Sequence, residues 1–246
     1  MLNATISGKR FKEFFKALSA FISEATLNIN ETGISSSAID QSGVALVEII
    51  LVSDAFESYK ATDGKVGISL VSIVEILELI DDEEKVSINL NITNQTFDIS
   101  ISGMLYENSL IDISTIKVPV KVSESETPSV VVLRGIHLKR GIKASEKVSD
   151  YVYINVNTKG LKIKAMGILS KIKLSLKRED LIKYNVIEDT SLLLASQYLV
   201  AITKVIKNNM NVKLEIANQL PIKISFDIAD RLGAVTYYLA PRVEHE

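Results

Sequence analysis

The segment Ser114–Ser129, with the sequence STIKVPVKVSESETPS, decides how this chain is divided. It contains Pro119 and Pro128, two of the four prolines, and it has neither glycine nor aromatic residues. Proline lacks a backbone donor and biases the residue before it away from helix, so the segment is expected to be extended and exposed. We therefore predict a linker over residues 114–129 that joins two domains, residues 1–113 and 130–246.

The regions on either side of this linker share one succession of patterns. Apolar residues at helical spacing predict two helices before the linker and two after it, at Ser7–Glu24, Leu70–Ile80, Gly135–Val148 and Ser196–Asn208. Apolar residues that alternate with polar ones predict strands between them, among them Val86–Ile92 and Ile222–Ile228. A strand-like pattern also covers residues 110–113.

Turn sequences recur at a nearly constant distance. Gly33-Ile34 corresponds to Gly160-Leu161, which lies 127 residues later, and Asn94-Gln95 corresponds to Asn218-Gln219, which lies 124 residues later. Such an offset indicates two copies of one fold. Helices that alternate with antiparallel strands predict the α+β class, with the helices on one face of the sheets.

The composition excludes several kinds of chemistry. The 246 residues include no cysteine, which excludes disulfides, cysteine zinc sites and cysteine nucleophiles. His137 and His245 are the two histidines, and neither lies in a recognisable catalytic motif. Gly64–Gly67 is expected to be a turn rather than a phosphate loop. The acidic run Asp81–Glu84 lacks the spacing of a calcium loop. We predict a protein with no catalytic residue, metal or cofactor.

The beginning of the chain lacks the pattern of a secretory signal. No apolar run is long enough to span a membrane, so no membrane partner is expected, and the lack of cysteine is compatible with an intracellular setting.

The net charge of −2 hides a strong asymmetry. Residues 1–115 carry a net charge of −10, and residues 116–246 carry +8. An acidic part and a basic part suit head-to-tail association between copies or related chains. A drift of surface charge between two domains remains an equally good interpretation of composition alone.

Basic side chains repeat on the outer faces of the predicted helices. Lys139, Lys143 and Lys147 are four residues apart, with Arg140 beside them. Lys12 and Lys16 share a face of the first helix, and Lys204 and Lys207 share a face of the fourth. On one helix such lysines could be merely solubilising, but their repetition on equivalent helices favours a surface that contacts phosphates without reading sequence.

Three stretches of the chain resemble the sliding clamps of the proliferating cell nuclear antigen (PCNA) type. They are residues 33–47 (GISSSAIDQSGVALV), Phe56–Tyr59 and the C-terminal stretch that contains Ile228-Ala229-Asp230 and Val235–Val243 (VTYYLAPRV). Together with the duplication, the resemblance covers essentially the whole chain and is of archaeal type. It implies a ring of three two-domain subunits, with helices lining a central hole and antiparallel sheets outside.

In such a ring, duplex DNA passes through the hole and is bound independently of sequence. The resemblance implies a non-enzymatic processivity factor for DNA replication and repair, bound to chromosomal DNA in the cytoplasm or nucleoid. Its expected partners are polymerase, clamp loader, ligase and flap nuclease. The DNA-facing residues implied here are Lys12, Lys16, Lys139, Arg140, Lys143, Lys204 and Lys207.

The resemblance also implies two protein interfaces. A pocket for partner peptides would be formed by Ile39, Leu46, Val118, Pro119, Pro221, Tyr238, Leu239, Ala240 and Pro241. Subunits would join through edge strands near Ser109–Ser114 and Ile168–Leu176, with the residues Leu110, Ile111, Ile113, Ile172, Leu174 and Leu176. The subunits could be copies of this chain or sister chains.

The chain departs from the family pattern in three places, one of which is the length of the linker. Glu75 and Glu78 occupy a helix face on which the family commonly presents basic residues, and Gly43 replaces a common histidine. Carboxylates that face DNA suit one subunit of a mixed ring better than three identical ones, which suggests a heterotrimer. A checkpoint-type clamp of the same fold remains an alternative, and a duplicated α+β enzyme or ligand-binding protein is a more distant one.

Overall fold

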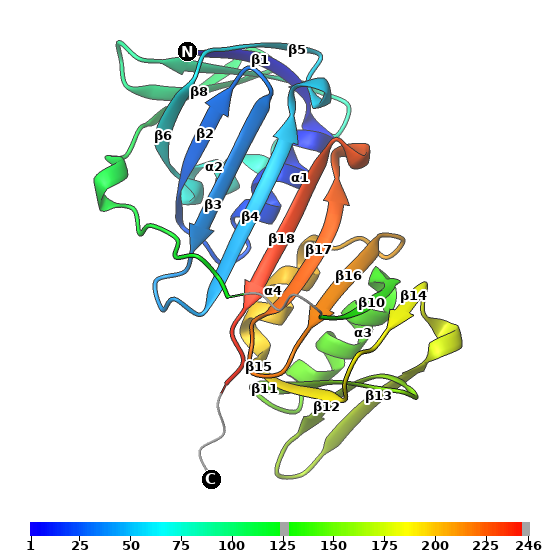
Figure 1. Ribbon diagram of the computed structural model, residues 1–246. Helices are drawn as coiled ribbons and strands as arrows, with labels where there is room; N and C mark the ends of the chain where they lie inside the picture. Colours follow the sequence, from blue (N-terminus) through cyan, green and yellow to red (C-terminus); the bar gives the residue numbers. More distant parts are fainter. Residues whose placement is uncertain (124–127, 243–246) are drawn as a thin grey trace. The chain divides into compact units, whose positions relative to one another are not determined.

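The computed structural model of the chain describes residues 1–123 and 128–242 (Figure 1). Part of the predicted linker, residues 124–127, and His245 lie outside the described residues. The chain forms two compact units. Unit 1 contains Met1–Pro119 and Asp227–Val235, and unit 2 contains Val120–Phe226 and the residues from Thr236 onward. The change from one unit to the other after Pro119 falls within the predicted linker.

Unit 1 contains a sheet with the strand order β5-β1-β7-β8-β9 and a row of strands in the order β4-β3-β2-β6. The elements are β1 Leu2–Ser7, α1 Gly8–Leu18, β2 Glu24–Asn30, β3 Gly33–Ile39, β4 Ala45–Val52, η1 Ser53–Ala55, β5 Ser58–Ala61, β6 Gly64–Ser69, α2 Leu70–Leu77, β7 Lys85–Asn91, β8 Thr96–Ile101, β9 Met104–Ser109 and η2 Ile113–Thr115. The neighbouring strands pair antiparallel.

Unit 2 repeats this architecture with the strand orders β14-β10-β16-β17-β18 and β13-β12-β11-β15. Its elements are β10 Ser129–Arg134, α3 Gly135–Glu146, β11 Tyr151–Asn157, β12 Gly160–Met166, β13 Lys171–Lys177, η3 Arg178–Asp180, β14 Lys183–Asn185, β15 Thr190–Ala195, α4 Ser196–Val205, β16 Asn211–Ile216, β17 Ile222–Ile228, η4 Ala229–Arg231 and β18 Gly233–Leu239. The residues between Asp227 and Val235, including η4, belong to unit 1.

The predicted duplication and α+β class are confirmed by this common element order and by matching backbone conformations. Gln95 and Gln219 occupy equivalent hairpin turns with φ of 53° and 59°. Gly33 and Gly160 begin equivalent strands with φ of 147° and 144°. A Cβ at either glycine would lie 2.1 Å from the carbonyl oxygen of the neighbouring strand, so both copies need glycine there.

The helices are amphipathic, and each is shorter than its apolar pattern predicts. In α1, the Ser7 side chain caps the helix by accepting from Arg10 N, and Phe11, Phe14 and Phe15 are buried. The helix ends at Leu18 rather than at Glu24. The apolar pattern extends beyond the helix because Ile22 is buried in the loop that leads into β2. The other three helices end at Leu77, Glu146 and Val205. Apolar spacing follows the burial of side chains, and buried side chains continue beyond the last helical turn.

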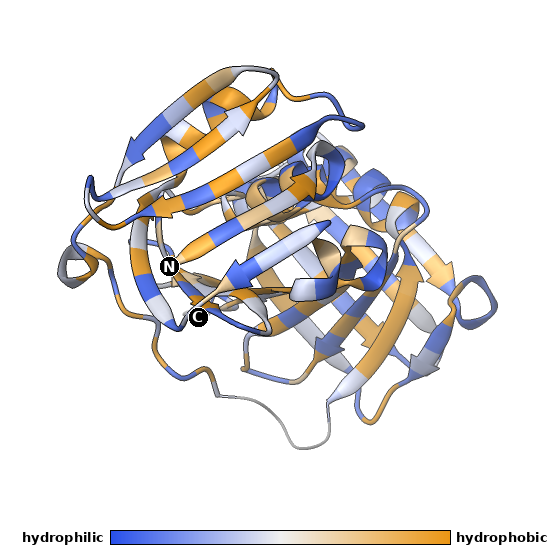
Figure 2. Ribbon diagram, turned by 90° about the horizontal axis from the view of Figure 1, so that it is seen from above, coloured by the Kyte–Doolittle hydropathy of each residue, from blue (hydrophilic) through white to orange (hydrophobic). Residues whose placement is uncertain are grey.

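Along the strands, every second side chain is buried in the core. The even-numbered residues of β7, Val86, Ile88 and Leu90, are at most 5% exposed. Figure 2 shows apolar and polar residues alternating along the strands. The expected turn at Gly64–Gly67 is wrong, because these residues begin β6. Gly67 fits this strand because a Cβ would lie 2.4 Å from the Ile111 carbonyl oxygen.

The strand expected at residues 110–113 is also wrong. The edge strand β9 ends at Ser109, the first residue of the predicted range 109–114. Leu110 N donates to Gln95 O, and Ile111 N donates to Gly67 O at 2.9 Å. The chain therefore leaves the edge of its sheet at Leu110, and η2 follows at Ile113.

Candidate nucleic-acid and partner interfaces

In unit 1, the start of α1 is bonded to the segment that follows α2, and this junction holds Lys12, one of the predicted DNA-facing residues. Gly8 N and Lys9 N, at the start of α1, donate to the carbonyls of Glu84 and Asp82, which lie after α2. Lys12, one turn into α1, donates from Nζ to the Ile80 carbonyl at 2.8 Å and pairs with the Asp82 carboxylate. Its side chain is only 17% exposed. Lys12 is therefore bound within its own unit.

Unit 2 contains the same junction. Gly135 N and Ile136 N donate to the carbonyls of Met210 and Asn208. Lys139 Nζ donates to the carbonyl of Ile206, the C-cap of α4, at 2.7 Å. A cation at a helix C-terminus satisfies an orphan carbonyl and interacts favourably with the helix dipole. The same lysine position therefore performs the same structural task in both units.

The other predicted DNA-facing residues project outward. Lys16 lies one turn beyond Lys12 on α1, and Lys143 lies one turn beyond Lys139 on α3; both are exposed. Arg140, Lys204 and Lys207 are exposed as well, and Lys207 lies just past the end of α4. Each unit thus presents basic side chains from its helices, although the role of all seven residues in DNA binding stays a prediction.

The exposed side of α2 is acidic and apolar rather than basic. Glu75 and Glu78 are exposed there. Val71 and Leu79 are each 57% exposed, on this short helix and just after its end. Among the four helices, α2 therefore offers the least favourable surface for a phosphate backbone.

An ion cluster at the start of α1 escaped the sequence analysis. Asp230 accepts from Lys9 Nζ at 3.1 Å and from Arg10 Nη2 at 3.3 Å. The bond from Lys9 is the main cause that holds the pKa of Asp230 below its usual value, and it raises the pKa of Lys9. Ala229, Asp230 and Arg231 all have positive φ, which costs free energy in non-glycine residues. The cluster therefore holds a strained turn, which no sequence periodicity reveals.

The unit 1 part of the predicted peptide pocket is built around the β3–β4 turn. Ile39 and Leu46 are opposite each other in the strand register. The buried Asp40 shapes the turn by accepting from the backbone N–H groups of Ser42, Val44 and Ala45. Lys117 Nζ donates to the carbonyls of Asp40 and Gln41, which fastens the linker beside the turn.

Beyond that fastening, Val118 is 77% exposed and Pro119 is half-buried. Gly43, where the family commonly has histidine, has φ of 78°, and a Cβ there would lie 3.3 Å from Lys117 Nζ.

The unit 2 part of that pocket follows the end of the chain. Tyr238 and Leu239 are buried in β18, at 7% and 0% exposure, and Lys223 Nζ lies 5.3 Å from the centroid of the Tyr238 ring. Pro221, Ala240 and Pro241 are half-buried. Val118, Pro119, Ile39 and Leu46 belong to unit 1, and these five residues belong to unit 2.

Two strands end their sheets and carry the predicted subunit contacts. β13 is the outermost strand of its row, with Ile172 and Leu174 half-buried and Leu176 buried. β9 is outermost in the unit 1 sheet, with Met104 and Leu105 exposed at 44% and 59%. Leu110, Ile111 and Ile113 follow β9, and Ile113 is 47% exposed. These are open edges, which natural proteins usually cover.

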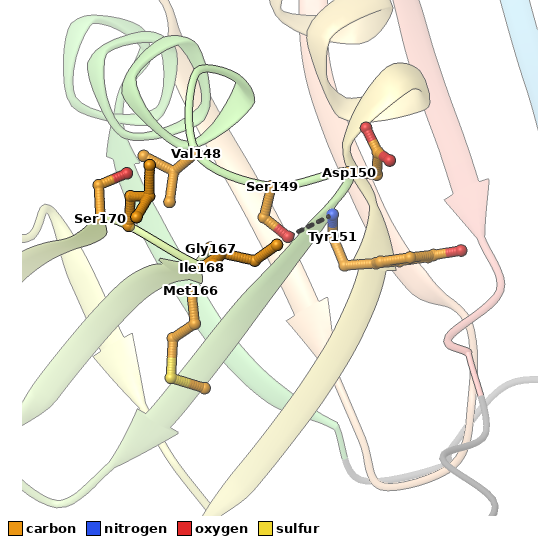
Figure 3. Close-up of a pocket in the computed structure, with 9 residues that line it drawn as sticks. Val148, Ser149, Asp150, Tyr151, Met166, Gly167, Ile168 and Ser170 are labelled. Carbon is orange, nitrogen blue, oxygen red and sulfur yellow. Dashed lines mark hydrogen bonds between the residues drawn. The ribbon is translucent and has the colours of Figure 1, made fainter.

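An open cavity of about 600 Å³ in unit 2 tests the idea of a hidden active site. It lies between the loop Val148–Asp150 and the β12–β13 turn, where Ile168 and Leu169 are fully exposed (Figure 3). Among the lining residues, Tyr151 N donates to Ser149 Oγ at 3.2 Å, and Gly167 N donates to the Ser170 carbonyl at 2.9 Å. Asp150, the carboxylate in its lining, is exposed. The cavity therefore lacks a buried acid suited to catalysis.

Two further features are absent from the part of the chain that the structure describes. No group of three or more metal-ligating side chains occurs among the described residues. None of the helices they form is long and apolar enough to cross a membrane.

Comparison with known families gives a match over nearly the whole chain. Residues 1–118 match the model of the N-terminal domain of proliferating cell nuclear antigen, and residues 121–242 match the model of its C-terminal domain.

Individual relatives agree with these matches. The chain is 35% identical to a protein of Methanocella arvoryzae and 34% identical to one of Methanosarcina barkeri, both named DNA polymerase sliding clamp, over 100% of each chain. Among solved structures, it is similar to A. fulgidus PCNA bound to the C-terminal region of FEN-1, with 26% identity, a TM-score of 0.92 and 100% of both chains covered. A chain of the PCNA2–PCNA3 complex from Sulfolobus tokodaii has the same fold, with 22% identity, a TM-score of 0.86 and 98% and 100% covered.

Proposed function

This chain belongs to the proliferating cell nuclear antigen family, and from this premise we propose that it is a DNA sliding clamp that encircles duplex DNA and docks replication and repair enzymes. The observation that carries the proposal is the full-length similarity to proteins named DNA polymerase sliding clamp. A clamp is a non-enzymatic processivity factor, and it acts inside the cell on replicating DNA. Its finer location, on the chromosome in the cytoplasm or nucleoid of an archaeon, is part of the proposal.

Contacts with DNA come from the exposed cations of the helices. Lys16, Arg140, Lys143, Lys204 and Lys207 supply charge without base-reading geometry. Lysine interacts with phosphate as a point charge, so the contacts are independent of sequence. A ring retains DNA topologically, and weak contacts leave it free to slide.

Assembly follows from the internal duplication. Within unit 1, the residues that begin β18 lie beside β4, and Val52 N donates to Leu232 O at 3.0 Å. The duplicates of β18 and β4 are β9 and β13, and both are open edges. We propose that β9 of one subunit pairs with β13 of the next, so that three subunits close a ring. The acidic face of α2 favours sister chains as neighbours, an arrangement that the PCNA2–PCNA3 complex illustrates for Sulfolobus tokodaii.

Partner enzymes dock through short peptides. The proposed contact residues in unit 1 are the exposed Val118, the half-buried Pro119 and the apolar residues of the β3–β4 turn, and those in unit 2 are the apolar residues of the C-terminal stretch. The A. fulgidus clamp, bound to the C-terminal region of FEN-1, supports this mode of binding for a flap nuclease, and polymerase, clamp loader and ligase are the other proposed partners.

A primer-extension assay tests the function. The assembled clamp with its loader is expected to increase the product length of the organism's replicative polymerase in a single binding event. A protein that assembles and loads but leaves the product length unchanged would favour the alternative of a checkpoint-type clamp.

A further inference from the structure

Four lysines form a quartet on the outer face of the four-stranded row in unit 2. Lys162 and Lys164 alternate along β12, and Lys171 and Lys173 alternate along β13. The register places Lys164 directly opposite Lys173. Residues that are opposite in antiparallel strands are about 5 Å apart, and those two along a strand are about 7 Å apart. Lys164 and Lys173 are therefore neighbours across the strands, and Lys162 and Lys171 each lie two residues from one of them along a strand.

This arrangement is unfavourable for the isolated fold. Like charges that lie directly opposite each other in a sheet destabilise it. Lys171 and Lys173 are exposed, and Lys162 and Lys164 are half-buried. The residues that the structure describes provide no ion pair to any of the four. A repulsive cluster with no internal compensation points to a ligand of opposite charge.

The duplicated row in unit 1 shows that the fold does not require these lysines. The pairs Lys164–Lys173 and Lys162–Ser175 correspond to Ser37–Glu48 and Ser35–Ile50 in β3 and β4. The same backbone thus carries two serines and a glutamate in one unit where it carries three of the four lysines in the other. The lysines therefore reflect a requirement specific to unit 2.

Aromatic rings flank the quartet. Tyr153 on β11 is opposite Lys164, so Tyr153, Lys164 and Lys173 lie in one line across three strands. Tyr151 lies two residues away on the same strand, and the Arg242 guanidinium lies 4.5 Å from the centroid of its ring. Basic side chains beside aromatic rings on a sheet are the usual means of binding single-stranded nucleic acid, through phosphates and stacked bases.

We propose that this face of unit 2, the lysine quartet with Tyr153, binds the phosphate backbone of single-stranded nucleic acid. The proposal rests on the proposed function in one respect: a protein that acts on replicating DNA meets single strands. This surface lies on the sheet, and it uses none of the helix residues proposed to face the duplex.

The test uses the assembled protein and a fluorescent oligothymidine. We expect the double variant K164Q/K173Q to weaken binding by about tenfold at low salt and to reduce the slope of log K against log salt by roughly 1.4, since each contact with a single strand contributes about 0.7. Its urea midpoint should stay the same or rise, because repulsion is relieved. The control variant K60Q/K65Q removes two exposed lysines of unit 1 and should leave binding unchanged.

Three results would overturn the proposal. They are equal oligothymidine binding by K164Q/K173Q and wild type, binding of polyglutamate but not oligothymidine, and loss of assembly in the double variant. The last would show that the quartet pairs with a neighbouring subunit. Retention on circular duplex DNA is measured separately, so failure of the clamp function and failure of this site give different results.

Discussion

The Lys139 ammonium donates to the Ile206 carbonyl at 2.7 Å, and Lys12 makes the equivalent bond to Ile80 at 2.8 Å. Each lysine is followed one turn later by an exposed lysine, Lys143 or Lys16. The structure thus provides two matched pairs in which one lysine is bound to a helix end and the other faces solvent.

Replacing Lys139 by methionine should destabilise unit 2 by about 1 kcal/mol, because the C-terminal carbonyl of α4 loses its donor. The salt dependence of duplex binding should change little. K143M should have the opposite effects: an unchanged urea midpoint and a shallower salt dependence. Urea titration and fluorescence anisotropy with a labelled duplex measure the two quantities. Equal loss of salt dependence in both variants would show that Lys139 contacts phosphate despite its bond.

Gly135→Ala should destabilise the helix junction by about 1–3 kcal/mol, the usual cost of overpacking. A Cβ there would lie 2.2 Å from the Lys207 carbonyl oxygen and 2.7 Å from Ile206 Cγ2. Gly64→Ala is the control, because the nearest atom to its Cβ would be 3.9 Å away. Thermal unfolding of both variants measures the effect, and a Gly135→Ala protein as stable as Gly64→Ala would refute the close approach.

The Asp230 cluster predicts a pH-dependent contribution to stability. Because the pKa of Asp230 is lowered on folding, its ionised form is favoured in the native state. Above the usual aspartate pKa of about 3.9, Asp230 makes its full contribution to the free energy of unfolding. That contribution is lost as the pH falls through the lowered pKa of Asp230 in the folded protein. The effect is small, since the Asp230 side chain is 56% exposed. Urea midpoints of wild type and D230N should differ at neutral pH and converge in acid; a constant difference would contradict the assignment.

Leu105→Glu should prevent assembly without unfolding unit 1. Leu105 is 59% exposed on the open strand β9, and a carboxylate there would be buried without a partner on pairing with another subunit. Light scattering of the chain, alone and mixed with sister chains, gives the mass of the assembly. Ile92→Glu is the control, since Ile92 is 65% exposed beyond the end of β7. Normal assembly of Leu105→Glu would exclude β9 from the interface.

Val118→Asp should abolish binding of a partner's docking peptide and leave the thermal midpoint unchanged, because Val118 is 77% exposed. Val120→Asp introduces the same charge two residues later, where the side chain is 67% exposed, and should bind the peptide normally. Calorimetric titration with the C-terminal peptide of the organism's flap nuclease measures both. If Val118→Asp lost stability as well as binding, the linker would have a structural role.

The sequence predicted the duplicated fold and the family, and both are confirmed. Helical spacing of apolar residues predicted α2, and burial imposes that spacing, since Ile73, Ile76 and Leu77 are buried. Helix ends did not follow from it, since apolar residues such as Ile22 are buried in the loop after the helix. The edge strand was predicted too far along the chain. Ile111 does not extend β9, because it donates to the carbonyl of Gly67, which is distant in sequence.

Sequence could not separate bound lysines from exposed ones. Lys12 and Lys16 have the same charge on the same helix face, and the positions of Ile80 and Asp82 after α2 distinguish them. The lysine quartet is visible as alternation in each strand, but its closeness depends on the register that places Lys164 opposite Lys173. Both features arise from tertiary structure.

Topological retention on DNA tests the central claim most directly. The clamp is loaded onto a nicked circular plasmid, the plasmid is cut once, and the protein that remains bound is measured before and after cutting. We predict stable retention on the circle and rapid release once the plasmid is linear, because a sliding ring leaves through a free end. Equal retention on both forms would contradict the account.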